Sequence, residues 1–233
     1  MVTTGSAAVA ERTFLLVHGI GMGIACFARL GSDLESHGQQ VAIDLPGCGD
    51  APVPRLALTM AQRGTVLIAF VEVEDLGKPV LVGQSMETQM VVEAAAQHPD
   101  PFPEVVPVAP PVNQHERPIP KHSLHIIQDV FRENPRVRVV GMRNDAKTGP
   151  GRFIKKLKSM MDHDVEDSLP KITAHTPVVR GKRDPVCPHG WGEEAIGLIP
   201  GARMGEVAGR GHETMVKDGS CVAGGSMEFV RIS

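Results

Sequence analysis

The sequence predicts an α/β protein with a mostly parallel sheet of about six strands flanked by helices. Short segments rich in β-branched and aliphatic residues alternate with segments whose apolar residues recur at helical spacing. This alternation is typical of parallel strands joined by helices. The length of 233 residues is sufficient for one domain with a sizeable core, and 42% hydrophobic residues is ordinary for a globular protein.

Six segments have the length and composition of strands: Thr13–Val17, Gln40–Ile43, Pro79–Val82, Glu104–Val108, Pro177–Arg180 and Met204–Val207. Pro107 weakens the fourth of them, because proline cannot donate to a strand ladder. Helical spacing predicts helices around Phe27–Leu34, over Thr59–Glu72 and over Met86–Gln97. Thr59 is a candidate N-cap of the second helix. The order of these segments is that of repeated strand–helix units.

The alternation stops between Pro110 and about Pro170, where His, Pro and charged residues are frequent and no strand is evident. Two parts of this region have helical patterns, Leu124–Arg132 and Arg152–Met161. We therefore predict a single α/β domain over residues 1–233 with residues 111–170 inserted as a helical lid. The basic residues of the second pattern oppose an apolar stripe, which favours an amphipathic helix with a solvated face over a site for acidic substrates or membranes.

Ser85, in the segment Val80–Glu87, is the most informative candidate for a catalytic residue. Three β-formers run into Gly83, Ser85 follows two residues later, and a helical pattern begins at Met86. A tight strand-to-helix turn of this kind, G-x-S-x-G, presents a serine hydroxyl as a nucleophile. The last glycine of the pattern is replaced by Glu87, so an ordinary serine in the first turn of a helix is the alternative.

A serine hydroxyl needs a base within hydrogen-bond reach, and the base needs an orienting group. Asp184 follows the predicted strand Pro177–Arg180, and His212 follows the last predicted strand. Because polar groups beyond the carboxyl ends of parallel strands gather at one edge of the sheet, we expect Ser85, Asp184 and His212 to meet there. Asp184 precedes a proline and could instead be a surface turn residue.

The chain resembles the α/β-hydrolase superfamily over nearly its whole length. Four motifs carry the resemblance: His18-Gly19-Ile20-Gly21, Asp44-Leu45-Pro46-Gly47-Cys48-Gly49, Gly181-Lys182-Arg183-Asp184-Pro185 and Gly211-His212. The likeness is greatest to compact esterases, lactonases and carbon–carbon bond hydrolases. The superfamily core commonly begins with an extra hairpin, and too few residues precede Thr13 for a full one, so a six-strand core is expected.

The resemblance implies an α/β-hydrolase fold and a cofactor-free serine hydrolase. Ser85 would attack an acyl carbon, His212 would take its proton, and Asp184 would hold the imidazole. The backbone N–H groups of Ile20 and Met86 would form the oxyanion hole. The rival hypothesis is a non-catalytic or decayed protein of the same fold that binds a small ligand, and Glu87 is its main motivation.

Other site types are less well supported by the sequence. His18 and Asp44 are expected to stabilise loops. The region 111–170 contains four histidines that we interpret as polar lid residues rather than metal ligands: His115, His122, His125 and His163. A metal site would need further ligands. The glycines between Gly19 and Gly23 do not fit a dinucleotide loop, because position 24 is Ile.

Charge and cysteine usage set the expected partners and compartment. A net charge of −3 gives no basic footprint for nucleic acid or an anionic membrane. The resemblance implies a small-molecule substrate as the partner. The four cysteines are widely spaced, and the first ten residues have no signal-peptide pattern. We therefore expect reduced cysteines and a cytoplasmic location.

Overall fold

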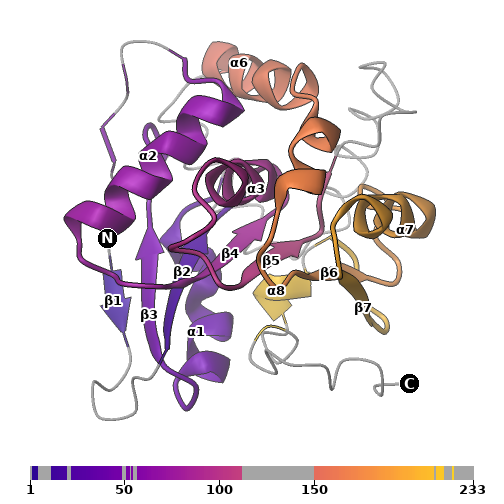
Figure 1. Cartoon of the computed structure of the whole chain (residues 1–233), viewed down its shortest axis with the longest axis horizontal. Coiled ribbons are helices and arrows are strands. Elements are labelled where there is room, and N and C mark those ends of the chain that lie inside the picture. The colour runs from indigo at the N-terminus through magenta and orange to yellow at the C-terminus, as the bar shows by residue number, and fades with distance from the viewer. Residues whose placement is uncertain are drawn as a thin grey trace.

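The computed structural model describes residues 2–4, 12–19, 22–48, 51, 52, 54, 57–111, 150–212, 214–217 and 222. Its centre is a seven-stranded sheet in the order β1-β3-β2-β4-β5-β6-β7 (Figure 1). The strands are β1 (Val2–Thr4), β2 (Thr13–Val17), β3 (Gln39–Ile43), β4 (Val80–Gln84), β5 (Val105–Val108), β6 (Pro177–Gly181) and β7 (Arg203–Val207). The six strands from β2 to β7 pair in parallel, as the alternation of the sequence predicts.

The seventh strand, β1, was not predicted. It pairs antiparallel with β3, with Val2 opposite Ala42 and Thr4 opposite Gln40. The residues before Thr13 are too few for a full hairpin but sufficient for this single edge strand. Three residues are also too few to show a two-residue alternation of apolar side chains.

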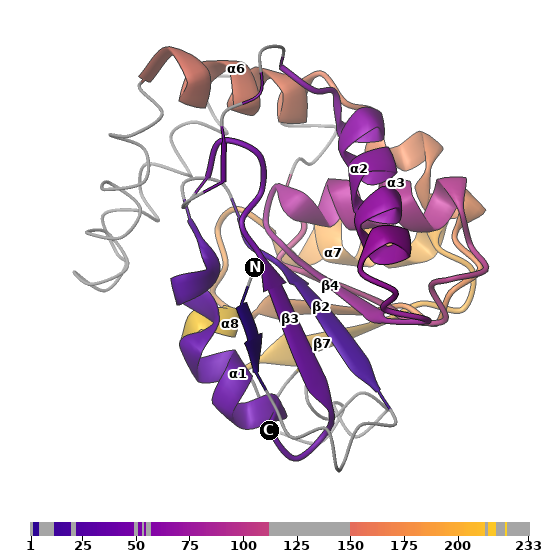
Figure 2. The same cartoon turned by 90° about the vertical axis from the view of Figure 1, so that its left-hand side faces the viewer.

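Helices cover both faces of the sheet. They are α1 (Ala28–Leu34), α2 (Met60–Val73), α3 (Glu87–Gln97), α6 (Pro150–Met161), α7 (His189–Leu198) and α8 (Thr214–Lys217), with short 3₁₀ turns η1 (Ile24–Phe27), η3 (Val165–Asp167) and η4 (Leu169–Lys171). Figure 2 shows α1 and α8 on one side of the sheet and α2, α3 and α7 on the other. Thr59 is the N-cap of α2 and forms a reciprocal capping box with Gln62, as predicted for Thr59.

The two faces of the sheet bury separate apolar clusters. In β2, Leu15 and Val17 pack on the side of α2, α3 and α7, whereas Phe14 and Leu16 pack on the side of α1 and α8. Successive residues of a strand point to opposite faces, and both faces are covered here. Because both faces of the sheet are buried, the strand segments are continuous apolar runs, and the polar groups lie at the strand ends.

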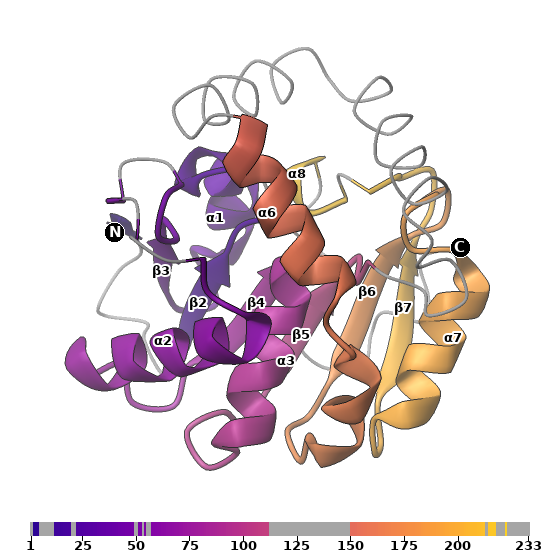
Figure 3. The same ribbon diagram turned by 90° about the horizontal axis from the view of Figure 1, so that it is seen from above.

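The predicted helix Arg152–Met161 is observed as α6, which crosses over the molecule in Figure 3. Met160 and Met161 are buried, but Ile154 of the same predicted apolar stripe is 62% exposed. The Gln89 side chain of α3 donates a hydrogen bond to the Met160 carbonyl, 3.2 Å away, and so ties the end of α6 to α3. The other predicted lid helix, Leu124–Arg132, lies outside the described residues, and the division into domain and lid stays a prediction.

Candidate active site

The turn between β4 and α3 holds Ser85 in an uncommon backbone conformation. Its φ angle is +52°, in a region that residues other than glycine rarely adopt. The Ser85 N–H donates to the Val108 carbonyl of β5 at 2.9 Å, which fixes the turn to the sheet. A Cβ at Gly83 would lie 2.7 Å from Val91 and 2.8 Å from the Glu87 carbonyl of α3. Strand and helix therefore approach closely at Gly83, and Ser85 sits at the apex of a sharp turn.

The loops after β6 and β7 bring Asp184 and His212 to Ser85. His212 Nε2 lies 2.8 Å from Ser85 Oγ, and His212 Nδ1 lies 2.9 Å from Asp184 Oδ2. A carboxylate only accepts hydrogen bonds, so it favours the tautomer with the proton on Nδ1. Nε2 then carries the lone pair that can accept the proton of the Ser85 hydroxyl. Three residues predicted from separate strand ends are thus joined in one hydrogen-bonded chain.

Asp184 is held in a buried turn and is only 3% exposed. Its Oδ1 accepts hydrogen bonds from the N–H groups of Val186, at 2.8 Å, and Cys187, at 2.9 Å. Burial opposes ionisation, but the attraction of His212 and these hydrogen bonds outweigh it and hold the pKa of Asp184 below its usual range. Asp184 is therefore a carboxylate at neutral pH, suited to orient an imidazole.

Two backbone segments are candidates for the predicted oxyanion hole beside the Ser85 turn. Gly19 lies against the elbow, since a Cβ there would be 3.3 Å from Ser85 Cβ. Met86 is the N-cap of α3, and the first N–H groups of a helix have no partner within the helix. The role of the Met86 N–H as an oxyanion donor stays a prediction. Ile20, the other predicted donor, lies outside the described residues.

His18 and Asp44 connect the loop after β2 to the loop after β3. His18 is fully buried; its Nδ1 donates to the Gly19 carbonyl at 2.9 Å and its Nε2 accepts from the Leu45 N–H at 3.3 Å. Burial lowers the pKa of His18, which agrees with a neutral ring making these two bonds. Asp44 accepts from the Ile24 N–H at 3.1 Å. Both residues stabilise loops around the elbow, as the sequence suggested.

Comparison with known families agrees with this fold and connectivity. The family described as "alpha/beta hydrolase fold" matches residues 12–145, more than half of the chain, and the family described as "TAP-like protein" matches residues 155–231. The chain belongs to the α/β-hydrolase fold family. No curated protein matches its sequence significantly.

Solved structures of α/β-hydrolase proteins superpose on nearly the whole chain. An enol-lactonase from Burkholderia xenovorans is 18% identical with a TM-score of 0.77, covering 98% of this chain and 95% of its own. An esterase from Exiguobacterium antarcticum is 17% identical with a TM-score of 0.79, covering 96% and 92%. A hydrolase from Oleispira antarctica is 14% identical with a TM-score of 0.82, covering 100% and 94%. At these identities the likeness establishes the shared fold.

Glu87 occupies the usual glycine position of the hydrolase elbow, in the first turn of α3. Its side chain is 1% exposed and turns toward α2, where Arg63 donates a hydrogen bond to Glu87 Oε1 at 3.3 Å. Burial raises the pKa of Glu87 to about 7, although the positive charges of Arg63 and Lys156 counteract this. The carboxyl is therefore neither a solvent-facing group nor a spacer that separates the strand from the helix; it is a buried group that accepts a hydrogen bond from Arg63.

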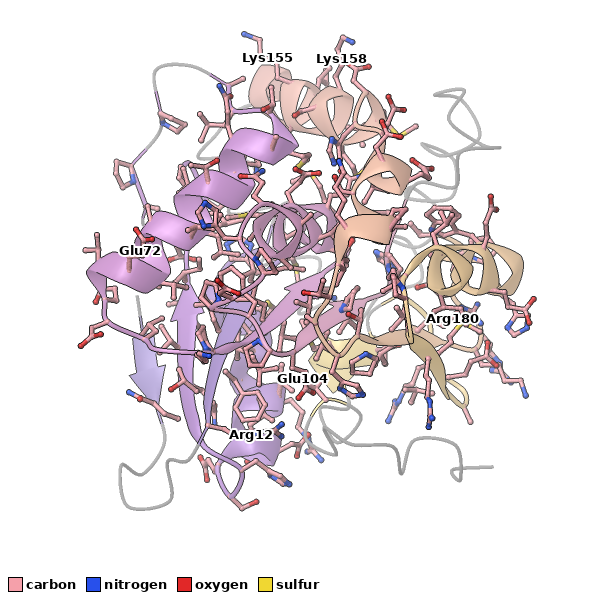
Figure 4. All side chains as sticks on the ribbon, viewed as in Figure 1. Arg12, Glu72, Glu104, Lys155, Lys158 and Arg180 are labelled. Atoms are coloured by element: carbon pink, nitrogen blue, oxygen red, sulfur yellow. The ribbon has the colours of Figure 1, made fainter. Side chains whose placement is uncertain are left out.

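Lys156 belongs to the basic stretch predicted to be solvated, and for this residue the prediction is wrong. The predicted solvated face of α6 holds for Lys155 and Lys158, which point away from the molecule in Figure 4. Lys156 instead turns inward and donates to the Gly47 carbonyl at 3.3 Å and to Cys48 Sγ at 2.8 Å. It thereby connects α6 to the loop after β3. Its position at the border between the basic and apolar faces of α6 is the one signal that could have indicated this.

The described part of the chain contains no group of three or more side chains suited to hold a metal ion. Of the four histidines considered for the lid, only His163 lies in that part, and its Nε2 is 3.2 Å from Glu93 Oε1 of α3. The others are outside the described residues: His115, His122 and His125. Across the same described ranges, the helices are too short or too polar to cross a bilayer.

Proposed function

We propose that this chain is a serine hydrolase that cleaves a small ester, lactone or related acyl compound through an acyl-enzyme. The observation that carries the proposal is the continuous contact from Ser85 Oγ to His212 Nε2 and from His212 Nδ1 to Asp184 Oδ2, at 2.8 and 2.9 Å. Nucleophile, base and orienting carboxylate are recognised by this geometry rather than by their order in a sequence.

In the proposed first half-reaction, Ser85 Oγ attacks the substrate carbonyl carbon while its proton passes to His212 Nε2. The Asp184 carboxylate stabilises the imidazolium that forms. The Met86 N–H, and by prediction the Ile20 N–H, donate to the oxyanion. His212 then gives its proton to the leaving alcohol, or to the ring-opened hydroxyl of a lactone, and the acyl group remains on Ser85.

In the second half-reaction, water attacks the acyl carbon and His212 Nε2 takes a proton from it. Collapse of the tetrahedral intermediate breaks the bond to Ser85 Oγ, which recovers a proton from His212. These steps are complete with protein groups and water, so the proposed reaction uses no cofactor. A small acyl substrate is favoured over other classes because the superposed structures include an esterase and an enol-lactonase.

The proposal is tested by labelling with a fluorophosphonate and by turnover of short p-nitrophenyl esters and a lactone panel. Wild-type protein should label at Ser85 and hydrolyse at least one short ester or lactone. Ser85→Ala should abolish both the label and turnover. Ser36→Ala removes an exposed serine after α1 and should change neither. Loss of a nucleophile commonly lowers the rate by about 10⁶-fold.

The rival function is a non-catalytic protein that binds a small ligand. It differs in one clear respect, since it does not require the Ser85 hydroxyl to react. Folded wild-type protein that takes up no fluorophosphonate and cleaves no member of the panel would favour the binding function. The hydrogen bond from Ser85 to a histidine with its own carboxylate is what favours the enzyme, because ligand binding alone does not need that arrangement.

A further inference from the structure

A buried arginine lies in the sheet beneath α7. Arg180 is 2% exposed and belongs to β6, where Val178, two residues earlier, packs on the same side with apolar residues of α7. Figure 4 labels Arg180 in the region of α7 and β7. Burying a guanidinium costs free energy unless the charge is paired and its donors are used. An aliphatic residue would be the ordinary occupant of this position.

The donors of Arg180 are used in two directions. Toward the solvent side, its guanidinium pairs with Glu206 of β7, which also contacts His189 at 2.8 Å. Toward the candidate active site, Arg180 Nε donates to the Cys187 carbonyl at 2.8 Å. Gly192 of α7 leaves room for the arginine stem, since a Cβ there would lie 3.2 Å from Arg180 Cδ.

Cys187 is the residue through which Arg180 reaches Asp184. The Cys187 N–H donates to Asp184 Oδ1 at 2.9 Å, beside the bond from the Val186 N–H. The other carboxylate oxygen, Oδ2, contacts His212. A continuous series of contacts therefore runs from Glu206 through Arg180 and Cys187 to the carboxylate that orients His212.

We propose that Arg180 is a positioning residue for Asp184: by fixing the Cys187 carbonyl, it holds the 184–187 turn so that Asp184 Oδ2 faces His212. The role rests on the proposed function, in which His212 is the base. A planar guanidinium suits this task because its several N–H donors can bind a carbonyl and a carboxylate at once. A group that only filled the space under α7 would not need the bond to Cys187.

The test compares Arg180→Met, Arg180→Lys and Glu206→Gln with the wild type. The methionine variant removes the bond to Cys187 and the charge, the lysine variant keeps the charge but loses the fork, and the glutamine variant removes the partner charge while leaving the bond to Cys187. The first readout is the pKa of His212, followed by NMR of its ring and assigned with His212→Gln. The second is kcat and KM on the best ester.

Positioning predicts that the His212 pKa falls in Arg180→Met by about one unit, because a loosened Asp184 attracts the imidazolium less. Removing a positive charge acts in the opposite direction and raises a histidine pKa, so an unchanged or higher value in this variant would overturn the proposal. Arg180→Lys keeps the charge, and a fall there supports the proposal in the same way. If Arg180→Met does not fold, the His212 pKa in Arg180→Lys decides whether Arg180 positions Asp184.

In the kinetic arm, kcat should fall by about 10- to 100-fold while KM stays within about twofold, as expected when a catalytic group is misplaced but substrate binding is not. Glu206→Gln should show the smaller change in both readouts, and an equal change would assign the effect to the ion pair and refute a role for the Cys187 bond. If the wild type turns over no substrate, the proposed function fails, while the titration of His212 still decides the role of Arg180.

Discussion

The buried carboxyl of Glu87 makes a strong prediction about stability and pH. In an exposed setting its pKa would be 4.5, whereas burial raises it to about 7 in the fold. Between these two values the folded chain keeps a proton that the unfolded chain releases, so the stability that Glu87 contributes is fully present below pH 4.5 and is lost as the pH rises through 7. A difference of this size corresponds to about 3 kcal/mol of unfolding free energy.

Glu87→Gln should remove this dependence, because the amide is neutral at every pH and can still accept a hydrogen bond from Arg63. Urea unfolding at pH 5, 6, 7 and 8 measures it. The wild type should lose about 2.5 kcal/mol relative to the glutamine variant between pH 5 and 8, with most of the change below pH 7. Carboxyls with lowered pKa do not interfere, since that of Glu93, at about 2, titrates below this range.

Glu72→Gln provides the control, because Glu72 is an exposed carboxyl on α2 and lies on the outer side of that helix in Figure 4. This variant should keep the pH dependence of the wild type. Two results would refute the reasoning about Glu87. Parallel loss of stability in wild type and Glu87→Gln would mean that its pKa is not raised. A glutamine variant that is less stable than the wild type at pH 8 would mean that the attraction of Arg63 outweighs burial.

Three further outcomes follow from local geometry. Gly83→Ala should lower the unfolding free energy by about 1–3 kcal/mol in urea titrations, because its Cβ would lie 2.7 Å from Val91, whereas Gly190→Ala on α7, with no atom within 4 Å, should be neutral or stabilising. Thr59→Ala should cost about 1 kcal/mol by losing the capping box of α2, measured by thermal denaturation against Thr65→Ala in the same helix. Burial raises the pKa of three thiols, so native protein should react with iodoacetamide at these sites far more slowly than protein in urea: Cys26, Cys48 and Cys187.

The sequence was sufficient for the parallel strands because apolar runs and turn residues are local signals. It also indicated that Ser85, Asp184 and His212 would meet, since the carboxyl ends of parallel strands share one edge of a sheet. Their mutual distances of 2.8 and 2.9 Å required the structure. Catalysis by these residues and the oxyanion role of Ile20 and Met86 stay predictions until the labelling experiment.

The spacing of residues along the sequence could not predict which side chains from distant segments would pair. Glu87 and Arg63 are 24 residues apart on different helices, and nothing in either segment indicates the other. Arg180 follows two valines, so an unusual charge in β6 was visible. Its partners depend on the loop after β6, which places Cys187, and on the pairing of β7 with β6, which sets Glu206 opposite Arg180. Such contacts arise from the packing of whole elements and not from local preference.

The packing of α2 against α3 explains how the elbow tolerates Glu87. The helices touch at Gly64, where a Cβ would lie 2.8 Å from Glu93 Cβ and 2.9 Å from the Ala94 nitrogen. This close approach brings the neighbouring Arg63 within reach of the first turn of α3, so the carboxyl finds a cation where it leaves the turn. The crowded contact between strand and helix lies at Gly83. The part of Glu87 that approaches Gly83 is the backbone carbonyl of Glu87, not the Glu87 side chain. Of the two glycine positions in the hydrolase elbow, only the first is therefore crowded in this chain, and the second is open to a side chain that can accept a hydrogen bond from α2.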